Sequence, residues 1–339
     1  MLLQAGARAR VAVILNQQAR GVRPEVMERL GRLVPERDLY VSRDLEHSRE
    51  IARKVIERAY DGVLFGGGDG TFVQCLSDIA DEARLADLPL PGVGVLRLGT
   101  GNAMADALGA SRPTLDGLVK DLRRARAAGH QKTLPLLSVD GKLTPFAGCG
   151  LDAQILEDFA RLGEAIDRVG GEHARKIGAG ARYFLTCALR STPRFMFSQL
   201  PEIEVINRGA PAYRVDWRTG RVMEETPILD GELVFRGRAA LCSASTIPYF
   251  GLKMKMFPYV RRDRFQLRCS TASAYETIRN LPAVFRGEYK TPNLHDFLCE
   301  DLEIRMERPV PVQIGGDLQD GLRDQLRVSL SARPIRVLS

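Results

Sequence analysis

Residues 64–80, LFGGGDGTFVQCLSDIA, join an apolar run to an amphipathic one through four glycines, an aspartate and a threonine. The apolar run predicts a buried strand, and the spacing of Phe72, Leu76 and Ile79 predicts a helix. A strand that enters a glycine-rich turn at the start of a helix brings backbone N–H groups together, and the helix dipole there favours an anion. The glycines also leave bare backbone for a ligand. We expect Thr71 to cap the helix.

A second stretch, residues 95–109 (VLRLGTGNAMADALG), repeats this arrangement further along the chain. Parallel strands would place both turns at the carboxyl-end edge of one sheet, where open α/β sheets bind ligands. Neither turn matches the P-loop pattern or the G-x-G-x-x-G dinucleotide fingerprint. Taken alone, the first turn is explained equally well as a tight strand-to-helix connection. The second turn favours an anion site.

The patterning changes about a third of the way along the chain. Apolar runs alternate with helical patterns over residues 1–131, which predicts a parallel sheet with crossover helices, an α/β domain. From Lys132, strands separated by Gly, Pro and Asp turns predict a β-rich domain over residues 132–326, followed by a strand or tail over residues 327–339. Helical patterns in residues 153–169 and 181–191 predict a helical insertion in the second domain.

Composition bounds the class of protein. The 339 residues carry a formal net charge of +7, which favours anionic partners such as nucleotides, phosphates and acidic lipid headgroups. No run approaches the roughly 20 apolar residues of a membrane-spanning helix, so we expect a soluble protein. The six cysteines form no C-x-x-C pair, so a zinc site or a disulfide framework is not predicted and a reducing cytoplasm is favoured.

With both glycine turns in place, the chain resembles the diacylglycerol kinase catalytic family, which includes sphingosine and ceramide kinases and bacterial lipid kinases. The likeness extends over nearly the whole chain. It implies an NAD-kinase-like α/β domain followed by a β-sandwich domain, with ATP in a cleft between them. The residues that match the two nucleotide-binding turns are Gly67, Gly68, Asp69, Gly70 and Thr71 for the first turn and Gly99, Thr100 and Asn102 for the second.

Three further matches are looser. The family's first strand ends in Asn-Pro, and here Asn16 is kept while Gln17 replaces the proline. Ser42 stands where the family often has a nucleotide-contacting threonine. Many relatives carry a late Asp-Gly-Glu whose glutamate is a proposed general base; here Asp317 takes the place of the glutamate, and Gly315 that of the first acid.

The resemblance implies a lipid kinase with ATP and Mg²⁺ as cofactors. It places Asp69 at the phosphate and metal end of the cleft and Asp317 at the lipid hydroxyl as base, with Asp152 in support. Without the resemblance, Asp317 is better explained as a hairpin residue and Asp152 as a helix N-cap; with it, both interpretations stay open for Asp152. Asp263 matches an aspartate that carries a structural magnesium ion in some relatives, but Arg264 replaces the following glycine, which puts that metal site in doubt.

A lipid substrate requires contact with a membrane. Residues 253–264 (KMKMFPYVRRDR) interleave basic and apolar side chains, which suits an anionic membrane surface. A strand pair with solvated basic ends is the commoner explanation of such a cluster. We therefore expect a cytoplasmic protein with peripheral membrane contact and no nucleic-acid partner, and the sequence leaves a homodimer open.

Two other functions compete with the lipid kinase. NAD kinases share the first turn, but they lack a second turn of the GTGNAMA type. A catalytically inactive nucleotide- or lipid-binding module would explain the departures at Gln17, Ala103 and Gly315. Ala103 is also what sphingosine and ceramide kinases tend to have, so this turn leans towards a sphingoid base or ceramide rather than diacylglycerol as acceptor.

Overall fold

The computed structural model describes residues 9–99, 102–127, 131–151, 153–154, 156, 158, 200–251 and 253–338. The chain forms two compact units, one of Met1–Pro135 with Ala332–Ser339 and one of Leu136–Ser331. The sequence placed this division after residue 131. Most of the predicted helical insertion lies outside the described residues, as do two predicted site residues, Thr100 and Asp152.

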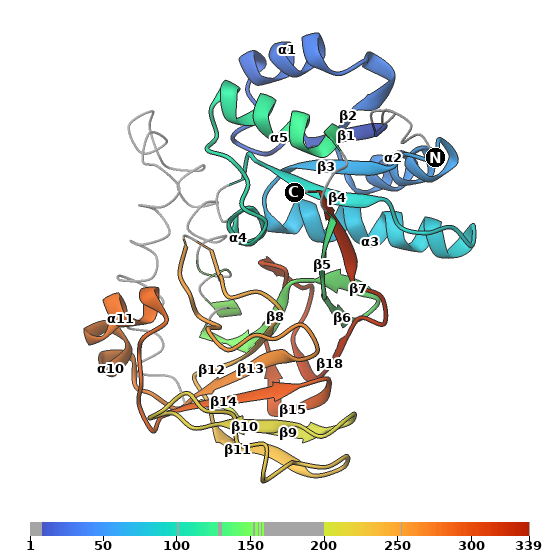
Figure 1. Ribbon diagram of the computed structural model, residues 1–339. Coiled ribbons are helices and arrows are strands. Elements are labelled where there is room, and N and C mark those ends of the chain that lie inside the picture. Colours follow the sequence, from blue (N-terminus) through green and yellow to red (C-terminus); the bar gives the residue numbers. More distant parts are fainter. Residues whose placement is uncertain are drawn as a thin grey trace, which may run out of the picture. The chain divides into compact units, whose positions relative to one another are not determined.

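The first unit is built on a mainly parallel sheet with the strand order β2-β1-β3-β4-β19-β5 (Figure 1). Its strands are β1 (Val11–Asn16), β2 (Leu39–Ser42), β3 (Gly62–Gly67), β4 (Gly92–Arg97), β5 (Gln131–Leu134) and β19 (Ile335–Leu338). The pairs from β2 to β19 are parallel, and only β5 runs antiparallel to its neighbour β19. The C-terminal strand β19 is thus inserted between β4 and β5.

Helices cover both faces of this sheet, α1 and α5 on one side and α2 and α3 on the other (Figure 1). The helical elements are α1 (Pro24–Leu33), η1 (Glu36–Asp38), α2 (Leu45–Glu57), α3 (Asp69–Leu85), α4 (Ala103–Ala107) and α5 (Leu115–Ala127). On the first side, Leu30 of α1 and Leu118 of α5 pack against Val13 of β1 in one core cluster. Coverage of both faces explains why every residue of β3 is buried.

The strand order reverses direction at β1. From β1 the chain goes to β2 on one side and then to β3 on the other, so the topological switch point lies between β1 and β3. In open α/β sheets, ligands bind outside the carboxyl ends of the strands at such a point. Strands β1, β2, β3 and β4 end there at Asn16, Ser42, Gly67 and Arg97. Those predicted site residues of this unit that the structure describes therefore gather at one edge.

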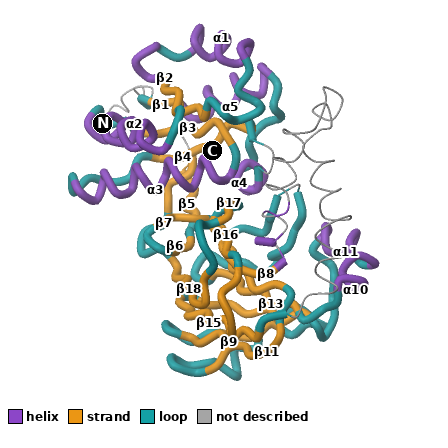
Figure 2. Tube along the Cα trace, turned by 180° about the vertical axis from the view of Figure 1, so that it is seen from behind, coloured by secondary structure: helices purple, strands orange, loops and turns teal. Residues whose placement is uncertain are grey.

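The second unit contains two antiparallel sheets, which Figure 2 shows in orange. One has the order β10-β14-β13-β12-β8-β16-β17 and the other β11-β9-β15-β18-β6-β7. The strands of the first are β8 (Phe146–Gly150), β10 (Tyr213–Val215), β12 (Leu241–Ser245), β13 (Phe265–Ser270), β14 (Leu294–Cys299), β16 (Val312–Ile314) and β17 (Asp317–Leu318). Those of the second are β6 (Leu137–Val139), β7 (Lys142–Thr144), β9 (Glu202–Asn207), β11 (Leu233–Arg238), β15 (Asp301–Val310) and β18 (Arg323–Leu330).

A pair of short helices, α10 (Ala274–Arg279) and α11 (Leu281–Arg286), connects β13 to β14. The sequence analysis did not predict it, because neither helix is long enough to show a helical period. The predicted fold class, an NAD-kinase-like α/β domain followed by a β-sandwich domain, is confirmed. Over the described residues, no helix is both long and apolar enough to cross a membrane.

Candidate active site

The glycine turn after β3 leads into α3 without a side-chain cap. Helix α3 begins at Asp69, and its N-cap residue is Gly68, with φ −92° and ψ −174°. The predicted capping role of Thr71 is therefore wrong, because the helix begins two residues before it. The Thr71 hydroxyl instead accepts a hydrogen bond of 2.9 Å from the Nδ2 atom of Asn16, at the end of β1. Two predicted nucleotide-binding residues are thus held together.

The carboxylate of Asp69 binds the N-terminus of another helix. Its Oδ2 atom accepts the N–H of Ala103 and its Oδ1 atom the N–H of Met104, both at 2.9 Å. These N–H groups open α4 and have no acceptor within that helix. A carboxylate at a helix N-terminus is stabilised by the hydrogen bonds and by the helix dipole. Asp69 therefore joins the two glycine turns.

The two turns also touch through their backbones. A Cβ atom on Gly99 would lie 2.2 Å from the Cα atom of Gly68, so only glycine fits at position 99. Gly21 approaches Leu98 in the same way: its N–H donates to the Leu98 carbonyl at 3.0 Å, and a Cβ there would lie 2.6 Å from that oxygen. The sequence predicted that these glycines leave bare backbone for a ligand. In the structure, that bare backbone allows the chain segments to approach one another closely.

Asn102 shapes the second turn from within. Its φ of 51° is in the left-handed region, which asparagine tolerates better than most residues. Its side chain accepts the Gly99 N–H and donates to the Gly99 carbonyl. The amide of Asn102 thus closes the turn on itself.

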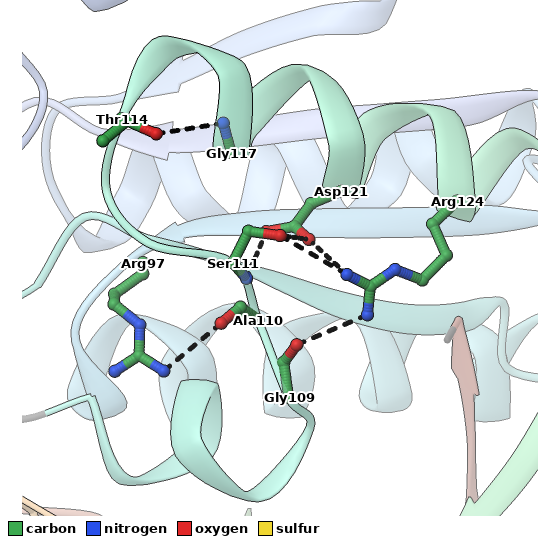
Figure 3. A network of polar contacts seen from close by, with 8 residues as sticks. All are labelled: Arg97, Gly109, Ala110, Ser111, Thr114, Gly117, Asp121 and Arg124. Atoms are coloured by element: carbon green, nitrogen blue, oxygen red, sulfur yellow. Dashed lines mark hydrogen bonds and ion pairs between the residues drawn. The ribbon is translucent and has the colours of Figure 1, made fainter.

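The far end of α4 is fixed by a polar network (Figure 3). Asp121 of α5 accepts the N–H and the hydroxyl of Ser111 at 2.9 and 2.7 Å, and it pairs with Arg124 at 2.8 Å. Arg97, at the end of β4, pairs with Asp106 of α4 at 2.7 Å, and both side chains are largely buried. Both ends of α4 are therefore anchored, one by Asp69 and one by these pairs.

A hollow of about 500 Å³ lies beside the ends of β1 and β2, within the size range of small-molecule sites. Its lining is mostly apolar and comes from β2 and from the residues around α1 and α2: Gln17, Val22, Pro24, Met27, Val41, Arg43 and His47. Ser42 stands between two lining residues, but its hydroxyl donates to the Asp44 carbonyl at 3.3 Å. The sequence analysis did not name Arg43 and His47 as lining residues of a site. Their position shortly after β2, at the predicted edge of the sheet, could have indicated them.

In the second unit, Asp317 follows a two-residue hairpin turn. Gly315 and Gly316 have φ values of 64° and 85°, and Ile314 pairs with Asp317 across the turn. Two positive φ angles are what a type I′ hairpin needs, which explains the glycines. The Asp317 side chain is exposed. Desolvation by the protein atoms around it raises the pKa of its carboxyl above the ordinary aspartate value, and the charge of Lys142 offsets part of this rise. Exposure to water weakens both effects.

Asp263 lies in an exposed turn at residues 261–264, closed by the Arg261 N–H donating to the Arg264 carbonyl at 3.2 Å. The Arg264 guanidinium donates to the Asp263 carbonyl at 3.2 Å and to the Glu300 carboxylate at 3.0 Å. Within the described ranges, no group of three or more His, Cys, Asp or Glu could hold a metal. A fixed positive charge beside Asp263 does not suit a structural Mg²⁺.

Comparison with known proteins agrees with this geometry. The diacylglycerol kinase catalytic domain family matches residues 10–132, the part of the chain that contains both glycine turns. Residues 10–132 form a diacylglycerol kinase catalytic domain. The predicted resemblance is confirmed, and so is the prediction of a lipid kinase, a phosphotransferase with an alcohol group as acceptor.

Solved structures extend the likeness beyond the catalytic domain. A diacylglycerol kinase from Bacillus anthracis str. Sterne is 15% identical, with a TM-score of 0.60. A structure from the same organism, provisionally assigned as a diacylglycerol kinase, is 16% identical, with a TM-score of 0.63. Each alignment covers 98% of both chains, so the two-unit fold is shared throughout. None of the curated proteins compared with the chain matches it.

Proposed function

We propose that this lipid kinase binds Mg-ATP at the carboxyl-end edge of the first unit and transfers its γ-phosphoryl group to a hydroxyl of a membrane lipid. The observation that supports it most is the Asp69 carboxylate, which joins the two glycine turns of the diacylglycerol kinase catalytic domain. Phosphoryl transfer depends mainly on the positioning of phosphates and on electrostatic stabilisation. A pair of turns locked to one another meets that need.

The nucleotide is assigned to two neighbouring places. Its phosphates lie at the start of α3, where the N–H groups of the first turn have no intrahelical acceptor and the dipole favours negative charge. Its adenine lies in the apolar hollow beside β1 and β2. Asn16 and Thr71, joined by their hydrogen bond, stand at the switch point and orient the phosphate side.

A magnesium ion, when bound, would be held by the nucleotide, water and few protein ligands, as is usual for this ion. Asp69 fits as a protein ligand because its carboxylate lies between the two glycine turns and carboxylate oxygens are the groups that this ion binds. When bound, the ion would neutralise charge that develops on the phosphates. We do not assign a metal to Asp263.

Asp317 is proposed as the general base. As the lipid oxygen forms its bond to the γ-phosphorus and the bond to ADP breaks, the Asp317 carboxylate accepts the hydroxyl proton. A pKa above the ordinary aspartate value makes the carboxylate a better proton acceptor. The Gly-Gly turn presents the side chain at the tip of a hairpin, exposed to a substrate. Asp152 remains a predicted supporting residue.

The acceptor is diacylglycerol, a sphingoid base or ceramide, and the protein meets it as a cytoplasmic, peripheral membrane enzyme. The decisive assay measures ADP release from ATP with each lipid in mixed micelles, with NAD as a further acceptor. Asp317→Asn is the matched control, because an exposed side chain can be changed without disturbing the fold. Turnover of NAD alone would identify an NAD kinase. Nucleotide binding without turnover of any acceptor would identify an inactive module.

A further inference from the structure

The helical pair α10–α11 is firmly attached to the second unit. The Glu276 carboxylate of α10 accepts hydrogen bonds from Tyr289, Thr291 and Asn293 at 2.6, 2.8 and 2.8 Å. The bond from Tyr289 contributes most to lowering the pKa of Glu276. On α11, Val284 is buried. The negative charge of α10 is thus directed towards the protein.

The other face of the helical pair carries exposed aromatic side chains. Tyr275 is 67% exposed and Phe285 37% exposed. Arg279 is four residues after Tyr275 and lies on the same face of α10. Pro282 is exposed three residues before Phe285 on α11. Figures 1 and 2 show both helices to one side of the antiparallel sheets of their unit.

Two exposed lysines adjoin this face. The N–H of Lys255 donates to the Phe285 carbonyl at 3.0 Å, which places Lys255 against the end of α11. Among the described residues, the side chains of Lys253, Lys255 and Arg279 form no hydrogen bond or ion pair. Arg286 pairs with Glu288 at 2.6 Å, with both side chains exposed. The predicted basic segment is therefore divided: its lysines are free, whereas Arg264 pairs with Glu300.

We propose that this surface, made of Tyr275, Arg279, Phe285, Arg286, Lys253 and Lys255, docks the enzyme on an anionic lipid bilayer. Exposed aromatic rings with basic side chains around them match the headgroup region, where aromatic rings partition and anionic lipids attract lysine and arginine. The surface is complementary in charge to such a membrane, since Glu276 faces inward and the exposed Glu288 offsets Arg286 alone. The proposal rests on the proposed function, because a lipid kinase must reach a substrate held in a bilayer.

The test measures binding of the full chain to vesicles of phosphatidylcholine with phosphatidylglycerol and to vesicles of phosphatidylcholine alone. Lys253→Gln/Lys255→Gln should weaken binding to the anionic vesicles about thirtyfold, as expected for two lysines near the surface. Tyr275→Ser/Phe285→Ser should weaken binding to anionic vesicles even in high salt, where the basic contribution is screened. Thermal unfolding confirms that each variant is folded.

Matched controls come from the first unit. Arg49→Gln/Lys54→Gln removes two exposed charges, and Leu85→Ser/Leu88→Ser removes two apolar side chains that are 75% and 46% exposed. Both controls should bind vesicles like the unaltered protein. Equal loss in a control and its test variant, or no loss in either test variant, would overturn the proposal. A dimer in light scattering that dissociates only in Tyr275→Ser/Phe285→Ser would also overturn it and assign the surface to a second copy.

Activity separates this proposal from the kinase function. The test variants should lose phosphorylation of lipid in vesicles but keep it with a short-chain, monomeric acceptor. If the unaltered protein phosphorylates no lipid but the vesicle results hold, the proposed function fails and the docking surface stands. If the variants phosphorylate vesicle lipid normally, the docking surface fails and the kinase function stands.

Discussion

Replacing Asp69 with asparagine should release the start of α4. The amide oxygen can still accept one N–H from Ala103 or Met104, but its NH₂ group then faces the other donor. Leaving that donor unpaired costs about 1–3 kcal/mol, and the remaining bond loses about 1 kcal/mol because its acceptor is no longer charged. We expect a total near 3 kcal/mol in local stability, since both hydrogen bonds have the ordinary length of 2.9 Å.

Hydrogen exchange read by mass spectrometry tests this expectation. Amides in Ala103–Ala107 should exchange about 100-fold faster in Asp69→Asn, because 1.4 kcal/mol corresponds to a factor of ten. The control, Asp81→Asn, changes the same charge on the same helix at a side chain that is 59% exposed and contacts Arg84. Exchange as slow as in the control would refute the reasoning. If turnover were then lost as well, Asp69 would serve chemistry alone.

Three further predictions follow from the geometry. Gly99→Ala should destabilise the first unit and abolish nucleotide binding, whereas Gly68→Ala, whose added Cβ would lie 3.8 Å from Gly99, should remain folded in thermal unfolding. Asp317→Asn should remove turnover and leave ATP affinity within about twofold in calorimetry, since the base acts on the acceptor and not on the nucleotide. A loss of ATP affinity as large as the loss of turnover would contradict this role. The raised pKa of Asp317 means that activity falls, as pH decreases, at a pH above the usual aspartate range. Lys142→Gln removes a charge that lowers this pKa, so the acid limb of the pH–rate profile should move to higher pH, and Lys142→Arg should restore it.

The sequence predicted the sheet and the gathering of its turns at one edge because both depend on local patterns. Strands β1, β3 and β4 are apolar runs followed by turn residues, and parallel order then brings Asn16, Gly67 and Asn102 to one edge. The role of Thr71 could not be predicted, since it depends on where β1 ends beside it. The partner of Asp69 lies in a different turn, so no spacing within one motif reveals it.

The second unit was predicted less fully. The Gly-Gly-Asp tripeptide correctly indicates a hairpin, but a hairpin residue and a general base have the same local sequence, so geometry within that unit does not decide between them. Arg264 in place of glycine raised doubt about a metal at Asp263 from the sequence alone, and in the structure its guanidinium pairs with Glu300. The helical pair α10–α11 is stabilised by hydrogen bonds of Glu276 with residues beyond the pair, and these contacts have no sequence period.

The insertion of β19 between β4 and β5 has a consequence for the order of events during synthesis. The whole second unit is synthesised before Ile335–Leu338, the residues of β19. The first unit, although most of it is synthesised first, therefore completes its sheet last. Until then the edge of β4 is open, and the spaces beside Gly62 and Gly92, which the Leu338 side chain fills, are empty. An open parallel edge is prone to wrong pairing. The nascent chain should therefore depend on chaperones longest in the first unit.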